Sequence, residues 1–257
     1  MNMNKMNYIN GGICSPKGFK AGGISCGIKK SGKKDLALIV SDRMCSVAGV
    51  YTTNKVKGAP IAVTKNNISD GMAQAIICNS GNANTCAPNG MEIAEKTCEI
   101  TAAALGMEKE DIAVCSTGII GRELSIEPFK TGIPALIGCL KYDGSGEASE
   151  AIMTTDTIPK SVAVEFELSG KKCRIGGIAK GSGMINPTMA TMLAFITTDV
   201  DISSDMLQRA LSENVKTSFN QICVDGDTST NDTVLVMANG LAENQHIESE
   251  NEDYHEF

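Results

Sequence analysis

The sequence predicts an α+β protein in which strands and helices pack as a sandwich. Strand-like and helix-like segments follow one another without the strict strand–helix–strand order of a doubly wound parallel sheet. Of the 257 residues, 42% are hydrophobic and only 4% are aromatic, so the interior must be built from aliphatic and Met side chains. A chain of this length can bury one large core or two small ones.

The first predicted elements are strands. Residues 35–53 contain two strand-like runs joined by a polar turn, and residues 74–84 contain a third run that ends in a loop rich in Gly and Asn. Pro88 is then suited to open a helix that continues to about Leu105, because apolar residues recur at helical spacing and Gly106 provides a stop.

Strand and helix patterns alternate again in the middle of the chain. Residues 111–121 predict a short strand that enters a turn of small residues, and residues 126–140 predict a second helix. Over residues 161–179, two alternating runs flank Ser169 and Gly170, which is typical of a β-hairpin.

The last third begins with a predicted buried strand at residues 191–199. Ser203 or Ser204 is then expected to cap a helix with one apolar face, and residues 232–240 predict a final strand. Residues 243–257 hold six Asp or Glu and no Lys or Arg. We expect this acidic tail to be solvated and the chain to lack a final packed element, as in a fragment.

Charge and composition exclude several classes of protein. The formal net charge of −7 comes almost entirely from the acidic tail, whereas a nucleic-acid-binding protein needs a basic surface. The N-terminus lacks the apolar region of a signal peptide and no stretch is long enough to span a membrane, so a cytoplasmic protein is expected. The ten Cys residues show no C-x-x-C spacing and His246 and His255 both lie in the tail, which argues against zinc and for reduced thiols.

Three familiar motifs match only in part. Residues 23–27 fit G-x-S-x-G, but the chain offers no well-placed His as a base. Residues 22–29 lack the lysine that must follow the last glycine of a phosphate-binding loop. Residues 225–236 begin like a calcium loop, but Thr230 and Val236 replace the required Gly and Glu, so we predict a turn rich in side-chain to backbone hydrogen bonds.

The segment "KGSGMINPTMATMLAFITTD" at residues 180–199 is the strongest candidate for a functional site. Its glycines permit close backbone approach, and Thr191 stands where the polar loop becomes the predicted strand. A threonine hydroxyl needs a base, and the α-amine that is freed when the Ala190–Thr191 bond is cut can serve as one. Self-cleavage is therefore one hypothesis, and the other is that Thr191 is an ordinary β-branched strand residue.

Five blocks of the sequence, in the same order, resemble the ornithine acetyltransferase family, the bifunctional glutamate N-acetyltransferase/amino-acid acetyltransferases of arginine biosynthesis. The resemblance covers nearly the whole chain from Gly11, and its order makes it far more specific than a single motif. The blocks are ICNSGNANTC (77–86), VCSTGIIG (114–121), AIMTTDT (151–157), IAKGSGMINPTMATMLAFITTD (178–199) and NQICVDGDTSTNDTVLVMANG (220–240).

The resemblance implies how the chain is divided. Family members cut themselves at the Ala–Thr bond of the M-A-T-M-L block, here Ala190–Thr191, which makes residues 1–190 an α chain and residues 191–257 the start of a β chain. It also implies an αββα-type sandwich like that of the N-terminal nucleophile hydrolases, and an assembly of two α and two β chains. No metal or nucleotide cofactor is implied.

The resemblance also implies roles for individual residues. Thr191 is the nucleophile, and Thr117 and Gly118 supply the oxyanion hole that meets charge on the acyl oxygen. Thr154, Lys180 and Thr191 bind the substrate, and a fixed lysine suits the α-carboxylate of both N-acetylornithine and glutamate. The implied reaction is ping-pong: the acetyl group passes from N-acetylornithine to Thr191 and then to glutamate. Some members also accept acetyl-CoA.

Alternatives to this transferase stay open. Complete family members continue well beyond the position of Phe257, so self-cleavage is expected to be possible here while acetyl transfer by this chain alone is expected to be weak or lost. A threonine-nucleophile aminopeptidase or amidase would use water in place of glutamate. An inactive truncated remnant would instead bind a partner through an exposed sheet edge.

Overall fold

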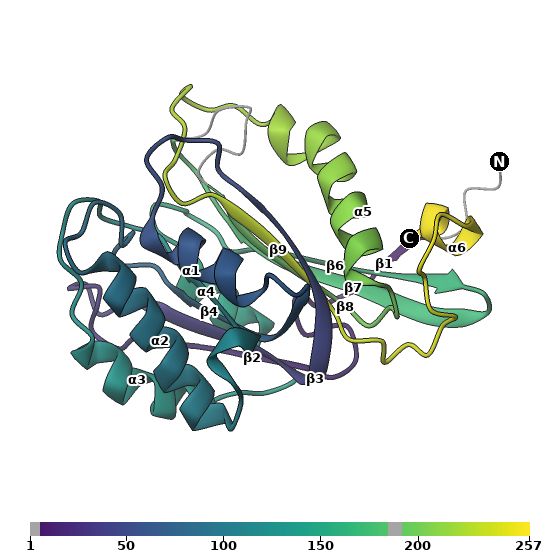
Figure 1. Cartoon of the computed structure of the whole chain (residues 1–257), viewed down its shortest axis with the longest axis horizontal. Helices are drawn as coiled ribbons and strands as arrows, with labels where there is room; N and C mark the ends of the chain where they lie inside the picture. The colour runs from purple at the N-terminus through teal and green to yellow at the C-terminus, as the bar shows by residue number, and fades with distance from the viewer. Residues whose placement is uncertain (1–5, 185–191) are drawn as a thin grey trace.

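The computed structural model describes residues 6–184 and 192–257, and their strands form one mixed nine-stranded sheet in the order β1-β6-β7-β8-β9-β3-β4-β5, with β2 paired to β3 (Figure 1). β4 pairs parallel with β5 and β8 pairs parallel with β9, while the other neighbours are antiparallel. The strands are β1 (Asn7–Tyr8), β2 (Phe19–Ile24), β3 (Leu36–Tyr51), β4 (Met72–Asn79), β5 (Ile112–Ser116), β6 (Lys160–Leu168), β7 (Lys171–Lys180), β8 (Leu193–Thr198) and β9 (Thr233–Ala238).

The long strand β3 joins the two halves of the sheet. Its first half pairs with β2 and its second half with β9, while β4 follows it on the other side. The prediction of two runs joined by a turn within residues 35–53 is therefore wrong. The polar residues at this point form an irregularity within one strand, because the register against β4 shifts between Val40 and Cys45 and the chain continues in the same direction.

Helices cover both outer faces of the folded sheet (Figure 1). α1, α2 and α3 gather over the half that contains β2 to β5, and α5 lies over the half that contains β7 to β9. α4 packs on β2, β3 and β7 and contributes to the core between the two halves. The helices are α1 (Ala59–Asn67), α2 (Gly90–Leu105), α3 (Glu127–Ile137), α4 (Ser145–Ile152), α5 (Ser204–Thr217) and α6 (Glu252–Glu256).

Alternating side chains explain this layering. On β8, Leu193 and Phe195 enter the core between the two halves, whereas Ala194 faces the cluster under α5. The same alternation runs along β9 and β3, so that one strand can serve two apolar clusters. The layers are thus helix, sheet, sheet and helix, and the predicted α+β sandwich is confirmed.

Several local signals are also confirmed. Ser169 and Gly170 have φ angles of 46° and 78°, as a tight hairpin between β6 and β7 requires. Gly106 ends α2 in the left-handed region, with φ 71°. The Ser203 hydroxyl caps α5 by accepting a hydrogen bond from the Met206 N–H at 3.4 Å.

The acidic tail corrects the expectation of a solvated end. Ile247 is fully buried and pairs with Ile202, and α6 places Tyr254 in the cluster beneath α5. The ring of Phe257 lies 6.4 Å from that of Phe166. The prediction was wrong because apolar residues are interspersed among the charges, and these residues pack while five of the six acids are exposed.

Replacing Ile247 by Ala is expected to lower the free energy of unfolding by about 2 to 5 kcal/mol, because it leaves a cavity under α5 and α6. Urea unfolding followed by circular dichroism measures this loss. Glu248→Ala changes the neighbouring exposed residue and is expected to have little effect. Equal stability of the two variants would mean that the tail does not stabilise the fold.

Side chains of α1 cover the outer backbone of the edge strand β5. The Thr64 hydroxyl donates to the carbonyl of Val114 at 2.6 Å and accepts from the N–H of the same residue at 2.8 Å. The Asn67 amide donates to the carbonyl of Ile112 at 2.9 Å. These backbone groups of β5 are therefore satisfied without a further strand.

Candidate active site

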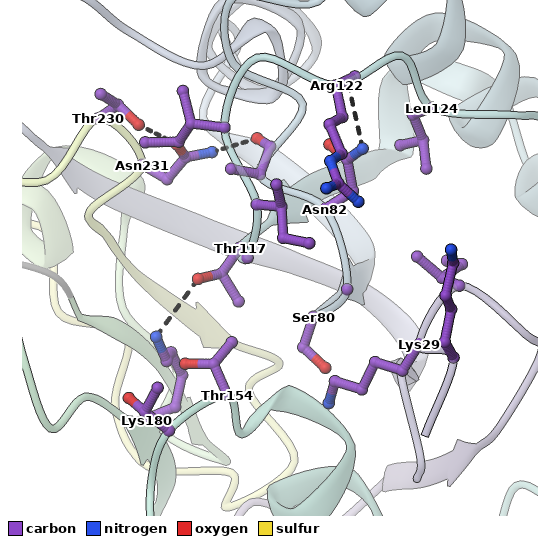
Figure 2. A pocket seen from close by; sticks show the side chains of 18 of the residues that line it. Lys29, Ser80, Asn82, Thr117, Arg122, Leu124, Thr154, Lys180, Thr230 and Asn231 are labelled. Atoms are coloured by element: carbon purple, nitrogen blue, oxygen red, sulfur yellow. Dashed lines mark hydrogen bonds between the residues drawn. The ribbon is translucent and has the colours of Figure 1, made fainter. Parts of the chain in front are cut away.

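A cavity of about 830 Å³ lies where loops from both halves of the sheet meet (Figure 2). Four of the residues predicted for the site, Thr117, Gly118, Thr154 and Lys180, line it, although they come from three separate blocks of the sequence. Thr191 and the cleavage residue Ala190 lie outside the described residues. The remaining lining comes from residues 27–31, 80–83, 119–120, 122–125, 128, 155, 183–184 and 229–231.

Lys180 and Thr117 contact each other directly in this cavity. Lys180 ends β7, is 2% exposed, and its ammonium donates to the Thr117 hydroxyl at 3.3 Å (Figure 2). Burial lowers the pKa of Lys180, although the nearby carboxylates of Asp156 and Asp232 act in the opposite direction. A buried ammonium with few partners is well suited to bind an anionic group that enters the cavity.

The hydrogen bonds of Thr117 limit what this residue can donate to a ligand. Its backbone N–H already donates to the Asn79 carbonyl at 2.9 Å, so only its hydroxyl can donate into the cavity. Because Lys180 donates to the hydroxyl oxygen, the hydroxyl proton stays available.

Gly118 cannot be replaced without strain. Its φ is +130°, and a Cβ atom there would lie 2.6 Å from the backbone carbon of Gly81. The loop that follows β5 therefore lies directly against the loop that follows β4. This contact fixes the direction of the Gly118 N–H.

Asp156 holds two segments of the cavity wall together. Its carboxylate accepts hydrogen bonds from the Gly181 N–H at 2.7 Å and the Thr154 N–H at 3.2 Å, and it pairs with Lys160 at 2.6 Å. Burial acts to raise the Asp156 pKa, but these hydrogen bonds outweigh it and the pKa is lowered. The ionised carboxylate thus keeps Thr154 beside Lys180.

Asn231 joins the end of β5, just before the candidate oxyanion residues, to the loop that follows β4, a role that the sequence analysis missed. Its amide nitrogen donates to the carbonyls of Ala83 at 2.6 Å and Ser116 at 2.9 Å, and its oxygen accepts from the hydroxyls of Thr85 and Thr230. All its hydrogen-bonding capacity is used. Its position in the block at 220–240 was a usable signal, but the calcium-like spacing of the neighbouring aspartates is the more prominent pattern there.

Lys29 was also missed. Its ammonium enters the cavity from the loop after β2 and donates to the carbonyls of Lys34 at 2.8 Å and Met153 at 2.7 Å. Burial lowers the pKa of Lys29, although the Asp35 carboxylate acts to raise it. The same carboxylate accepts hydrogen bonds from the N–H groups of Cys26 and Lys29 and so holds this loop. Lys29 is therefore a structural cation that closes one side of the cavity.

The segment that begins like a calcium loop, residues 225–236, starts with a hydrogen-bonded turn. Asp225 accepts hydrogen bonds from the N–H groups of Met184 and Asp227, so the predicted hydrogen-bonded turn is confirmed.

Within residues 6–184 and 192–257, no three His, Cys, Asp or Glu side chains form a group that could hold a metal ion. No helix in this part of the chain is long and apolar enough to cross a membrane.

Comparison with known proteins gives consistent relatives. The model of the ArgJ family matches residues 20–257. An arginine biosynthesis bifunctional protein ArgJ from Symbiobacterium thermophilum is 48% identical over 98% of this chain and 63% of its own length, and one from Bacillus anthracis is 50% identical over 96% and 61%. The chain thus spans about three fifths of the length of these curated relatives.

Solved structures agree with this assignment. ArgJ from Bacillus halodurans has a TM-score of 0.68 at 38% identity, and an ornithine acetyltransferase from Mycobacterium tuberculosis, solved with ornithine, has 0.66 at 34%. Each match covers 73% of this chain. It covers 98% of the Bacillus halodurans chain and 100% of the Mycobacterium tuberculosis chain. An aminopeptidase from Ochrobactrum anthropi with a variant of the N-terminal nucleophile hydrolase fold shares the fold alone, with a TM-score of 0.55 at 12% identity. The chain belongs to the ArgJ family.

Proposed function

We propose that this chain supplies the nucleophile and most of one wall of a self-cleaving acyltransferase. The enzyme moves an acetyl group from N-acetylornithine to glutamate, which yields ornithine and N-acetylglutamate. Residues 1–190 are its α chain and residues 191–257 begin its β chain, with Thr191 as the nucleophile. Two copies of each chain form the assembly in the cytoplasm, and acetyl-CoA is a second possible donor.

The observation that carries this proposal is the pairing of Lys180 with the Thr117 hydroxyl inside a cavity that Gly118 and Thr154 also line. The Lys180 ammonium, the Thr117 hydroxyl and the Gly118 backbone thereby meet in one cavity. Family membership adds the relative solved with ornithine, an amino acid whose carboxylate would suit the Lys180 ammonium.

The proposed chemistry uses these groups in turn. Thr191 attacks the acetyl carbon of N-acetylornithine, and negative charge develops on the acyl oxygen. The Thr117 hydroxyl and the Gly118 N–H stabilise that charge, while Lys180 holds the α-carboxylate of the substrate. Ornithine leaves, the amine of glutamate attacks the acetyl-threonine ester, and the free Thr191 is restored.

The mass of the purified chain under denaturing conditions tests the cleavage step. Two fragments that meet at the Ala190–Thr191 bond are expected, because an activated Thr191 would cut the bond before it. Thr191→Ala is the matched control and should yield one species near 27.0 kDa. A single uncut species from the unaltered chain would contradict self-cleavage.

The fate of the acetyl group separates the transferase from an aminopeptidase or amidase. A transferase passes acetyl from N-acetylornithine to added glutamate, whereas a hydrolase releases free acetate whether or not glutamate is present. N-acetylglutamate and acetate can be measured in the same reaction. Acetate as the main product would favour the hydrolase.

A further inference from the structure

The Asp232 carboxyl group is fixed beside Met192 by a hydrogen bond. Asp232 directly precedes β9, is 1% exposed, and its Oδ1 accepts a hydrogen bond from the Met192 N–H at 2.8 Å. β8 and β9 run parallel with Leu193 opposite Thr233, so Asp232 and Met192 lie level at the same end of the sheet. Met192 is the residue that follows Thr191 in the sequence.

The second carboxyl oxygen of Asp232 is not fixed in the way that the first oxygen is. Oδ2 is buried and has no hydrogen-bond partner among the described residues. A buried carboxyl oxygen without a hydrogen bond costs free energy, and it can accept a proton that a neighbouring group releases. Asp199, at the other end of β8, is equally buried, but both its oxygens accept backbone N–H groups, from Arg174 at 2.7 Å and Lys17 at 3.1 Å.

The charges around Asp232 leave it able to gain and lose a proton near neutral pH. Burial raises the pKa of Asp232 to about 7, although the Met192 N–H, the Ser229 side chain and the Lys180 cation act to lower it. Lys180 itself is faced by Asp156, Cys78 and Lys160. A group that transfers protons works best when its pKa lies near the working pH.

We propose that Asp232 is the proton carrier for self-cleavage at the Ala190–Thr191 bond, a role that rests on the cleavage proposed above. The ionised carboxyl takes the hydroxyl proton of Thr191 as that oxygen bonds to the Ala190 carbonyl carbon. The proton then passes to the Thr191 nitrogen as the carbon–nitrogen bond breaks, which leaves an ester and a free amine. Asp232 is ionised again once it has given up this proton, and water then hydrolyses the ester to the Ala190 carboxyl group and the Thr191 hydroxyl.

A pulse of labelled chain made by cell-free translation tests this role. The chain is transferred to buffers from mildly acidic to mildly alkaline pH, and the cleavage rate is read from the intact and cut bands. The unaltered chain is expected to cleave faster as pH rises through neutrality, because the ionised form must accept the proton. Asp232→Asn is expected to cleave at least about 100-fold more slowly and to lose this pH dependence.

Two variants complete the test. Asp199→Asn should keep the pH profile of the unaltered chain, since it changes a buried carboxyl group that only supports backbone. If Asp232→Asn does not fold, Asp232→Glu decides: it restores a titrating carboxyl group, so pH-dependent cleavage is expected to return. A folded Asp232→Asn that cleaves at the normal rate with the normal pH profile overturns the role of Asp232 but leaves self-cleavage intact, whereas no cleavage of the unaltered chain overturns both.

Discussion

Replacing Gly118 by Ala is expected to slow self-cleavage and acetyl transfer by about 100- to 1000-fold, the typical effect of losing one oxyanion donor. The added Cβ would lie 2.6 Å from the Gly81 carbon and 2.8 Å from the Asn82 nitrogen. Backbone atoms cannot move aside as the end of a side chain can. The loop after β5 must therefore shift, and the Gly118 N–H turns away from the position where charge develops.

Gly121→Ala is the matched control for this substitution. Gly121 lies in the same loop and also has positive φ, +75°, but a Cβ there meets nothing within 4 Å. It is expected to cost about 1 kcal/mol of stability through backbone strain and to leave the cleavage rate nearly unchanged. Cleavage is followed by denaturing gel electrophoresis, and circular dichroism checks that both variants fold. Equal cleavage rates of the two variants would rule out Gly118 as a donor.

Lys180→Met is expected to stabilise the fold while it removes substrate binding. Lys180 is a buried cation with one hydrogen-bond acceptor among the described residues, and such a cation costs free energy. An apolar side chain of similar length is expected to recover about 1 to 4 kcal/mol. The loss of the fixed cation is expected to weaken binding of the substrate carboxylate roughly 10- to 100-fold. Thermal unfolding with and without N-acetylornithine measures both effects: the variant should have a higher Tm without ligand and a smaller further rise with ligand than the unaltered chain.

The difference in stability between Lys180→Met and the unaltered chain is expected to depend on pH with a definite sign. Because burial lowers the pKa of Lys180, the folded state binds the lysine proton less tightly than the unfolded chain does. The cost is present at neutral pH and fades as the pH rises toward the ordinary value of 10.5. The Tm advantage of Lys180→Met should therefore shrink in alkaline buffer. Lys160→Met, which removes a half-exposed partner of Asp156, should show no such advantage.

The sequence predicted those strands and helix ends that depend on local residue patterns. Alternation located β6 to β9, and small residues and caps located the ends of α2 and α5, because these signals act within a few residues. β2, α1 and α4 were not predicted. β2 is rich in Gly, and α1 carries both Pro60 and polar residues that bind β5, so tertiary contacts decide their structure.

The site was predicted unevenly for a similar reason. Thr117, Gly118, Thr154 and Lys180 came from the family resemblance, and they line one cavity. Asn231 and Asp232 did not stand out, because the property that sets them apart is burial beside segments more than 30 residues away. No spacing rule within a single sequence reports that kind of neighbourhood.

The position of β8 and β9 has a consequence for the physical chemistry of the cut molecule. Both strands follow residue 191, yet they lie between β7 and β3, which precede it. Two ladders of hydrogen bonds and a shared core would hold the pieces together after the bond between them is cut. Unfolding would then become a dissociation as well, so the melting temperature of the cut protein should rise with protein concentration, as it does for a dimer. Folding must also come first, because two separated pieces would have to find each other from solution.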